Sequence, residues 1–519
     1  MRDRMDEGSI VRKFLDADFH LTPDALEVLQ RQADGDLVAD RILLDLRRMD
    51  EKPIVVNAEI IEQILKKISI DKAGLSEEGI KAEIPPPAKT VPELTHLKFK
   101  PFAREVEARV EVLMDVTGHS YGEGEIEDFL ELFKDRYERI SKILRNRSDF
   151  RDVVQIRNLR RQESGDVVKV IGMVSDKRET SGGHLVMELE DLSGKASVWI
   201  FKKNKDMINK AAKVVLDEVI GVEIKILGGD RGPRLMVSDI FWPDLPSPRE
   251  PARADEDVCA VLLSDLHVGS EMFLEDAFLK FLRWLKGEIG NSDQRDLAGR
   301  VKYLVIAGDL VDGVGIYPRQ DEELLIQDIF KQYDVVAELL AEVPDYIKII
   351  AAPGNHDAVR PSEPQPAIPR DVAPGLFDLG AVMVGNPVWV KLHGVKFLIY
   401  HGRSFDDLVS AIPGLGRDNS TPVMIHLLQK RHLAPIYGER VAIAPEERDY
   451  LIIDDVPDVF HCGHMHVYGC DKYRDVIVVN SGTFQEKTIY MKSMGVEPTP
   501  GIVPIVDLKA NQARAVRFV

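Results

Sequence analysis

Cysteine is scarce in this chain: its 519 residues include three, Cys259, Cys462 and Cys470. An odd and sparse count excludes a disulfide framework. No two of them are spaced as C-x-x-C, which argues against a structural zinc knuckle. We therefore expect the three thiols to be buried and to behave as small apolar side chains.

Long apolar runs are also missing. No stretch approaches the roughly 20 residues that a membrane-spanning helix needs. The N-terminal segment MRDRMDEGSIVRKF is charged and lacks the apolar centre of a signal peptide. We therefore expect a cytoplasmic protein without a membrane partner, and its length suggests about two to four domains.

Positive charge is in short supply. The chain has 68 Lys and Arg against 87 Asp and Glu, which gives a formal net charge of −19. Because affinity for nucleic acid rests largely on neutralising phosphates, so acidic a chain is a poor free-standing DNA binder. If its substrate is nucleic acid, a partner is expected to bring it.

The first 70 residues (1–70) are expected to form a small helical domain. Thr22 before Pro23 is typical of a helix start, because threonine caps free N–H groups and proline fits the first turn. Asn57 likewise precedes the helical pattern AEIIEQILKKI. A proline-rich linker is predicted at 71–105, since the prolines at 85–87 cannot continue a helix. A docking motif for a partner is the alternative there.

A helix and an OB-fold domain are predicted within residues 106–247. Apolar residues between 126 and 144 recur at steps of three and four, which indicates an amphipathic helix. Its apolar residues are Ile126, Phe129, Leu130, Phe133, Tyr137, Ile140 and Leu144. We expect this face to pack on the next domain, and a surface for a partner is the alternative.

The segment from 153 to 245 has the composition of a β-barrel. Runs rich in valine, isoleucine and aromatic residues alternate with glycine turns, and one helical piece lies at 204–212. Barrels of this kind often bind single strands through basic and aromatic side chains. Candidates are Trp199, Phe201, Lys202, Lys203 and Lys205. Trp199 and Phe201 share one strand face, so core packing or a subunit-docking role of the barrel stays open.

Residues 248–519 carry the most informative pattern, in which five apolar runs each end in residues that can bind a metal. The runs are CAVLLSDLH (259–267), YLVIAGD (303–309), IIAAPGNHD (349–357), FLIYHG (397–402) and VFHCGHMH (459–466). Each is predicted to be a strand that stops where its ligands begin. The candidate ligands are Asp265, His267, Asp309, Asn355, His401, His464 and His466.

This mixture of carboxylate, amide and imidazole groups suits Mn²⁺, Fe²⁺ or Zn²⁺ better than Mg²⁺ or Ca²⁺ alone. Two ions about 3.5–4 Å apart need a bridging carboxylate, and Asp309 is the natural candidate. His356, beside Asn355, is placed to protonate a leaving alkoxide. Asp312 could orient its imidazole. His461 falls outside the ligand pattern, so we expect its side chain to pack within a strand and not to be a ligand.

The motifs SDLH, GDLVD, GNHD, HGR and GHMH, in this order, resemble those of the calcineurin-like metallophosphoesterases. The resemblance implies an α/β domain with two packed β-sheets flanked by helices. It also implies that Asp265, His267, Asp309 and His466 hold one ion, and that Asp309, Asn355, His401 and His464 hold the other. His356 would be the catalytic histidine, assisted by Asp312.

The segments SDLHVGSEMF, GDLVDGVGIYPRQ and PGNHDAVRPSEPQP, with the barrel upstream, resemble the small subunits of archaeal D-family DNA polymerases. The resemblance implies a proofreading 3′–5′ exonuclease that uses two divalent ions, expected to be Mn²⁺ (with Fe²⁺, Zn²⁺ or Mg²⁺ as alternatives). It implies as partners a large catalytic subunit, DNA 3′ ends, and a sliding clamp or other replication factors. The alternatives are a catalytically silent scaffold subunit and a stand-alone phosphodiesterase or repair nuclease.

Three arginines next to the motifs are candidates for phosphate contacts: Arg319, Arg360 and Arg403. Arginine suits phosphate because its planar guanidinium offers paired donors. The chain has many carboxylates, so each of these arginines could instead form an internal ion pair.

Overall fold

The computed structural model describes residues 99–228 and 233–519, together with 14, 19–30, 42–43, 55–58 and 60–61. The chain divides into two compact units, Met1–Ile80 and Lys81–Val519. The prolines at 85–87 and most of the predicted helical segment 58–68 lie outside the described residues. In the described parts, no helix has the length and apolar character to cross a membrane.

The first unit contains the predicted helix start. Helix α2 (Pro23–Gln30) begins at Pro23, but the Thr22 hydroxyl donates to the carbonyl of Val56 at 3.2 Å. Asn57 accepts the N–H of Ile60 at 3.0 Å, as expected of a cap. A short parallel pairing of β1 (His20–Leu21) with β2 (Val55–Val56) was not predicted, because two residues are too few to show an alternating pattern.

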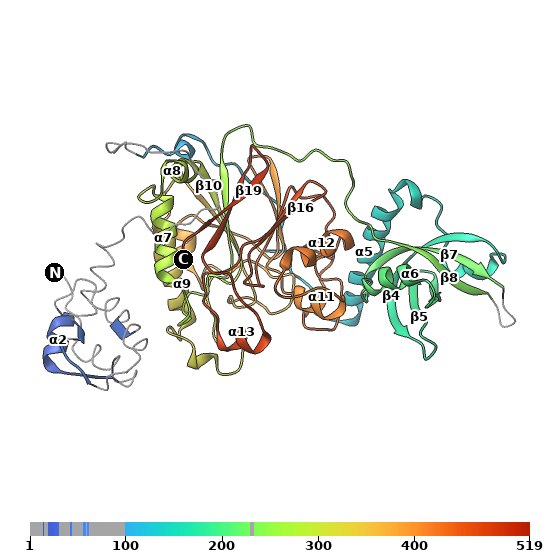
Figure 1. Cartoon of the computed structure of the whole chain (residues 1–519), viewed down its shortest axis with the longest axis horizontal. Helices are drawn as coiled ribbons and strands as arrows, with labels where there is room; N and C mark the ends of the chain where they lie inside the picture. The colour runs from blue at the N-terminus through green and yellow to red at the C-terminus, as the bar shows by residue number, and fades with distance from the viewer. Residues whose placement is uncertain are drawn as a thin grey trace. The chain divides into compact units, whose positions relative to one another are not determined.

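The predicted β-barrel is confirmed, and it has five strands. It closes in the order β4-β5-β6-β8-β7, with α6 (Lys205–Ala212) beside it (Figure 1). Alternate residues of each strand fill its core, among them Val170, Leu189 and Ile224. The strands are β4 (Val167–Glu179), β5 (Leu185–Asp191), β6 (Gly194–Ile200), β7 (Val219–Leu227) and β8 (Arg234–Phe241).

Helix α5 (Ile126–Arg145) has the predicted bounds but buries only part of the predicted face. Ile140 and Leu144 are fully buried. Ile126 and Leu130, in the first turns, are 74% and 64% exposed. The C-terminal half of α5 packs on the barrel, where Ile140 and Leu144 meet Ile171 and Val219, so the packing expectation holds for that half.

Two six-stranded sheets make up most of the second unit. The first has the order β12-β11-β10-β9-β18-β19 and the second the order β16-β17-β15-β14-β13-β3. The first sheet comprises β9 (Cys259–Leu263), β10 (Val301–Ala307), β11 (Lys348–Ala352), β12 (Val382–Met383), β18 (Ile502–Asp507) and β19 (Gln512–Arg517). The second comprises β3 (Val110–Met114), β13 (Val388–Leu392), β14 (Val395–Ile399), β15 (Val459–Cys462), β16 (Gly469–Tyr473) and β17 (Val476–Asn480).

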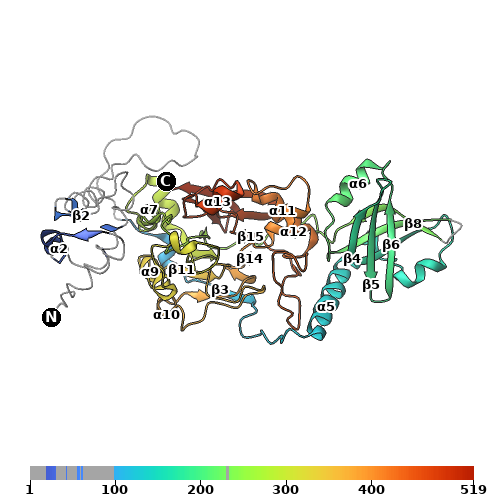
Figure 2. The same cartoon turned by 90° about the horizontal axis from the view of Figure 1, so that it is seen from below.

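The two sheets pack face to face, and helices cover their outer sides (Figures 1 and 2). Leu262, Val305 and Ile350 of the first sheet meet Phe397 and Val459 of the second in one apolar core. The main covering helices are α7 (Glu275–Leu285), α8 (Ser292–Gly299), α9 (Ile329–Ala341), α11 (Phe405–Ala411) and α12 (Ser420–Lys430). Short helices are η1 (Phe102–Glu105), η2 (Ser148–Phe150), η3 (Ile156–Arg161), η4 (Gln320–Glu322), α10 (Pro374–Asp378) and α13 (Ile489–Met494).

The five apolar runs of the sequence are β9, β10, β11, β14 and β15. β9, β10 and β11 run parallel to one another, and so do β14 and β15. Every residue of β9, β10 and β15 is buried, which explains why their sequences are mostly apolar. Cys259 and Cys462 are buried within these strands, but Cys470 is exposed on the edge strand β16, so that prediction was wrong for one thiol.

A buried ion pair joins α5 to the loop before β15. Arg136 Nε donates to Asp449 Oδ2 at 2.8 Å, and both side chains are at most 1% exposed. His432 Nε2 lies 2.8 Å from the same oxygen. Burial alone would raise the pKa of Asp449, but the attraction of His432 and Arg136 outweighs it and holds this pKa well below its usual value.

We expect Arg136→Leu to lower the free energy of unfolding by about 3–5 kcal/mol, because Asp449 would keep a buried charge without its main partner. Thermal unfolding measures the change. Lys134→Leu on the exposed side of α5, where the ion pair with Glu131 is open to solvent, should cost less than about 1 kcal/mol. Equal losses in the two variants would contradict this account of the pair.

Candidate metal centre

The predicted ligands gather where five strands end. Asp265 and His267 follow β9, Asp309 follows β10 and Asn355 follows β11. His401 follows β14, and His464 and His466 follow β15. Because parallel strands present their carboxyl ends at one edge of a sheet, these segments meet although they are far apart in sequence.

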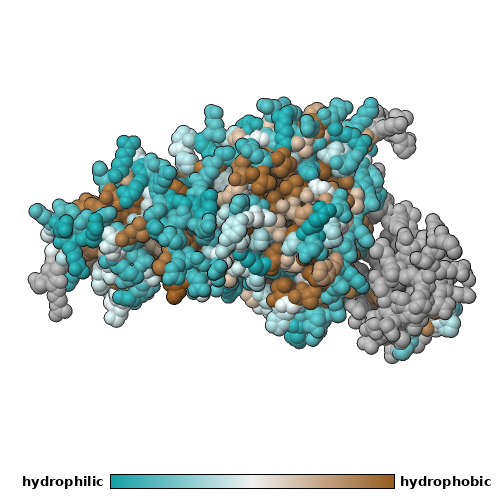
Figure 3. Space-filling view, turned by 180° about the vertical axis from the view of Figure 1, so that it is seen from behind, coloured by the Kyte–Doolittle hydropathy of each residue, from teal (hydrophilic) through white to brown (hydrophobic). Residues whose placement is uncertain are grey.

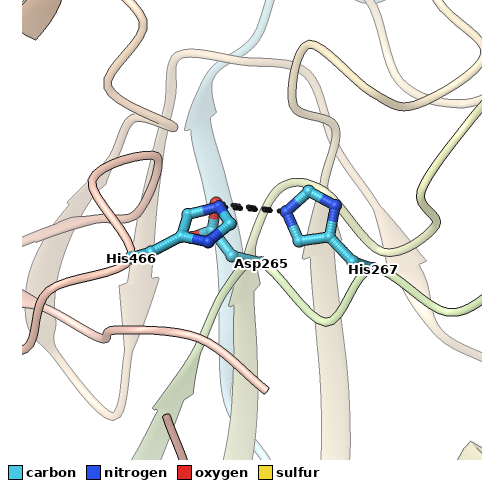
Figure 4. Close-up of side chains that lie close together, drawn as sticks. All are labelled: Asp265, His267 and His466. Carbon is cyan, nitrogen blue, oxygen red and sulfur yellow. Dashed lines mark hydrogen bonds and ion pairs between the residues drawn. The ribbon is translucent and has the colours of Figure 1, made fainter. Parts of the chain in front are cut away.

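Asp265, His267 and His466 form the first group, with their ligand atoms within 4.8 Å of one another (Figure 4). His466 Nε2 lies 3.3 Å from Asp265 Oδ1. The Nε2 atoms of His267 and His466 are 3.1 Å apart. Two imidazole nitrogens facing each other beside a buried carboxylate form a donor set that fits a divalent cation.

Asp309 lies between this group and a second one. Its Oδ2 is 3.7 Å from His267 Nε2 and 3.2 Å from His401 Nε2. Asn355 Oδ1 is 3.1 Å from the same nitrogen of His401. Asp265, Asp309 and His401 also satisfy the 4.8 Å limit together. The position of Asp309 between both groups is the one that a bridging carboxylate requires.

His464 differs from the other predicted ligands. Its Nε2 is directed at Asp406 Oδ2, 3.6 Å away on α11, and its ring lies edge-on to His401 with centroids 5.2 Å apart. The remaining nitrogen, Nδ1, is the one through which His464 could bind an ion. Asp406 also pairs with Arg417 at 2.6 Å, and no sequence motif singled it out.

Asp312 contacts His356 in a different way from the one predicted. The Nδ1 of His356 donates to the backbone carbonyl of Asp312 at 2.7 Å. The Asp312 carboxylate instead accepts from His267 Nδ1 at 3.0 Å. The reason is local: Gln320 and Gln485 also donate to this carboxylate and hold it toward His267. Asp312 therefore touches both imidazoles through different atoms.

Hydrogen bonds to the outer ring nitrogens fix which nitrogen faces the centre. The Nδ1 of His401 donates to the carbonyl of Ala307 at 2.9 Å, and that of His267 to Asp312. Each Nε2 is left as the inward-facing nitrogen, the arrangement found in carboxylate–histidine–metal sites. His461, in contrast, lies inside β15 and bonds Ser481 at 3.0 Å, as expected of a packed histidine.

The backbone around the site is unusual. Asp265, His267, Asp309, His464 and His466 all have positive φ, between 51° and 68°. Such conformations are costly for residues other than glycine and cluster at functional sites. A Cβ on Gly354 would lie 2.2 Å from Asp309 Oδ1, and one on Gly463 would lie 2.4 Å from Asp265 Oδ2. The two glycines are therefore required for close approach.

Charge balance also favours a cation. Burial raises the pKa of Asp309, but His401, His356 and His267 outweigh it and hold this pKa well below its usual value. Burial lowers the pKa of His401, and Asp309 overcomes that effect and raises it to about 10. The ionised Asp309 carboxylate thus favours a proton on His401, and a bound cation would replace that proton.

Several supporting residues nearby carry no signal in the sequence. Asp357, the last residue of GNHD, accepts N–H groups of Gly354 and Leu310 and the hydroxyl of Tyr333. Asn386 accepts the N–H of His401 at 2.9 Å. These groups act through backbone geometry, which leaves no periodic pattern along the chain.

The three candidate arginines have different surroundings. Arg360 pairs with Glu446 at 2.6 Å and bonds Ser120 and the carbonyl of Pro364, so its guanidinium is engaged within the structure. Arg319 is exposed at the start of η4, and Arg403 is half-buried two positions after His401. Within the described residues, neither of these two forms an ion pair with an acidic side chain.

We expect Gly354→Ala to lower any phosphodiesterase activity of the centre by about 100-fold or more, because the new methyl group displaces Asp309. Metal content should fall with activity, and both can be measured on the same preparation. Gly182→Ala, whose added carbon would make ordinary contact with His184 at 3.4 Å, is the control. Full activity in Gly354→Ala would show that Asp309 is not needed at this position.

The chain is similar to several known proteins. A family model for the B subunit of DNA polymerase alpha/epsilon matches residues 260–470, the range that holds all the candidate ligands. The chain is 42% identical to a protein of Methanothermobacter thermautotrophicus named DNA polymerase II small subunit, over 91% of this chain and 96% of the relative. It is 39% identical to the protein of the same name from Archaeoglobus fulgidus, over 96% of each. Among solved structures, an archaeal phosphodiesterase matches 50% of this chain and 99% of its own, at 16% identity and a TM-score of 0.27.

Proposed function

The chain belongs to the family of archaeal DNA polymerase II small subunits, and from this premise we propose that it supplies the polymerase with a metal-dependent 3′–5′ exonuclease that removes misincorporated nucleotides. The observation that carries the proposal is the position of Asp309 between two groups of ligand atoms. A scaffold with a degraded site would have no reason to keep this complete donor set.

The donor set fits two divalent cations, of which Mn²⁺ is the first candidate because nitrogen and oxygen donors are mixed. Asp265, His267, Asp309 and His466 would hold one, and Asp309, Asn355, His401 and His464 the other. When bound, such a pair activates water and stabilises charge on the phosphate oxygens.

The remaining chemistry falls to the chain's own residues. The His356 ring packs edge-on against His267, with centroids 4.6 Å apart, and the Asp312 carbonyl fixes its Nδ1–H. Its Nε2 is then the atom that would deliver a proton to the leaving 3′ oxygen. Arg319 and Arg403 would contact the phosphates flanking the scissile bond, while the internal bonds of Arg360 suit a supporting role.

The net charge of −19 supports a division of labour. A chain with this charge repels DNA over most of its surface, so we propose that a large catalytic subunit supplies most of the affinity for DNA and delivers the 3′ end. The exposed first turns of α5, with Ile126 and Leu130, offer apolar surface for a partner.

We expect Asp309→Asn to abolish nucleotide removal from a 3′-labelled mismatched primer in Mn²⁺, in the presence of the large subunit. Because Asp309 would serve both ions, metal content should fall as well, which elemental analysis can measure. Asp321→Asn, at an exposed acidic residue nearby, should behave as wild type. If the wild-type complex leaves primers intact with Mn²⁺, Mg²⁺, Fe²⁺ and Zn²⁺, the chain is a catalytically silent scaffold.

His356→Ala should have a different effect: metal content stays at the wild-type level while the rate falls by about 10²–10⁴-fold. His119→Ala, at an exposed histidine, controls for the substitution itself. Loss of metal in step with activity would make His356 a ligand and would place the proton donor elsewhere.

A further inference from the structure

A pair of stacked tyrosines lies beside the candidate catalytic histidine. Tyr317 belongs to the loop 313–319 that follows Asp312, and its ring centroid is 6.3 Å from that of His356. Tyr317 also stacks on Tyr490 of α13, with centroids 5.6 Å apart and planes at 24°. The metal centre described above uses neither ring.

The base of this loop is fixed to the centre. Gln320, buried behind it, donates to the carbonyl of Asp312 at 2.7 Å and to its carboxylate at 2.8 Å, and accepts the N–H of Ile316 at 2.9 Å. Gln332 bonds both the N–H and the carbonyl of Gly313. The position of Tyr317 is therefore set by the same residues that set Asp312.

The tip of the loop and the start of α13 expose apolar side chains. Val314 is 50% exposed and Ile316 39%, and on α13 Ile489 is 65% and Tyr490 51% exposed. Exposed apolar surface that is gathered in patches marks binding sites more often than scattered single residues do. Figure 3 shows the face seen from behind the view of Figure 1, on which hydrophobic patches interrupt a largely hydrophilic surface.

We propose that Tyr317 and Tyr490 form a stacking platform for the unpaired base at the 3′ end of DNA. The inference rests on the proposed nuclease function, because the terminal base is joined to the scissile phosphate by a single sugar and must lie next to the metal centre. Aromatic rings stack with any base, so a platform suits an enzyme that removes all four nucleotides.

The chemistry of the patch favours a base over a phosphate. The Tyr317 hydroxyl donates to the Glu323 carboxylate at 3.2 Å, so negative charge lies at this edge. An uncharged base face tolerates that charge, whereas a phosphate is repelled. A paired 3′-terminal base is held by its base-pair hydrogen bonds and by stacking on its neighbour, so a frayed or mismatched base reaches the platform at lower cost.

The first test measures kcat/KM of the complex with the large subunit on two single-stranded oligonucleotides, one with a normal 3′ nucleotide and one with an abasic 3′ residue. Tyr490→Ala should lower the rate on the normal end by on the order of tenfold, and the abasic end should show a much smaller loss. Tyr490→Phe should restore the rate. Phe102→Ala removes an exposed aromatic ring from η1, which lies at the opposite end of β10 from the centre, and should change neither rate.

The second test does not depend on catalysis. In an Asp309→Asn background, an oligonucleotide with 2-aminopurine at its 3′ end should lose fluorescence on binding, and Tyr490→Ala should abolish this quenching. Equal losses on normal and abasic ends, unchanged quenching, or dissociation of the Tyr490→Ala complex into its subunits would each overturn the platform. Quenching that follows Tyr490, found together with a wild-type complex that leaves primers intact, would retain the platform and refute the proposed function.

Discussion

The buried approach of two carboxylates, Asp265 and Asp309, is the constraint on which the rest of the site depends. Both are at most 1% exposed, and like charges this deep repel strongly unless positive charge lies between them. Four imidazoles surround them, glycines 354 and 463 leave room for their oxygens, and five residues adopt left-handed backbone to aim the side chains. Each of these features costs stability in isolation. Together they fit the donor arrangement of a candidate cation site.

The sequence predicted the elements and the residues that meet, because both follow from local patterns. Strands β9, β10 and β15 are buried along their whole length, and most of β11 and β14 is buried as well, so each appears as a mostly apolar run whose end marks the site. The barrel was readable from strands separated by glycine turns. Features that depend on how side chains point in the folded chain could not be predicted from the sequence. They are the pairing of His464 with Asp406, the hydrogen bond from His356 to the carbonyl of Asp312, and the exposure of Ile126 and Leu130.

The order of the strands along the chain also differs from their order in the sheets. Strand β3 (Val110–Met114) precedes the barrel, yet it pairs with β13 at the edge of the second sheet. Its composition gives no sign of this, because the three central residues of this short edge strand are all exposed and leave no alternating pattern. The domain boundary predicted at 247 therefore leaves one strand of the second sheet, β3, on the same side as the barrel.

This pairing makes the barrel an insertion within the sandwich and not a module placed before it. During synthesis β3, at the edge of the second sheet, is made first. Its neighbour β13 is made only after the whole barrel and the strands β9 to β12. A fragment that starts after the barrel would leave the outer N–H and C=O groups of β13 without partners, and such an open edge invites pairing with other chains. The two-sheet body is thus discontinuous in the chain: a cut between the barrel and β9 separates β3 from the sheet to which it belongs.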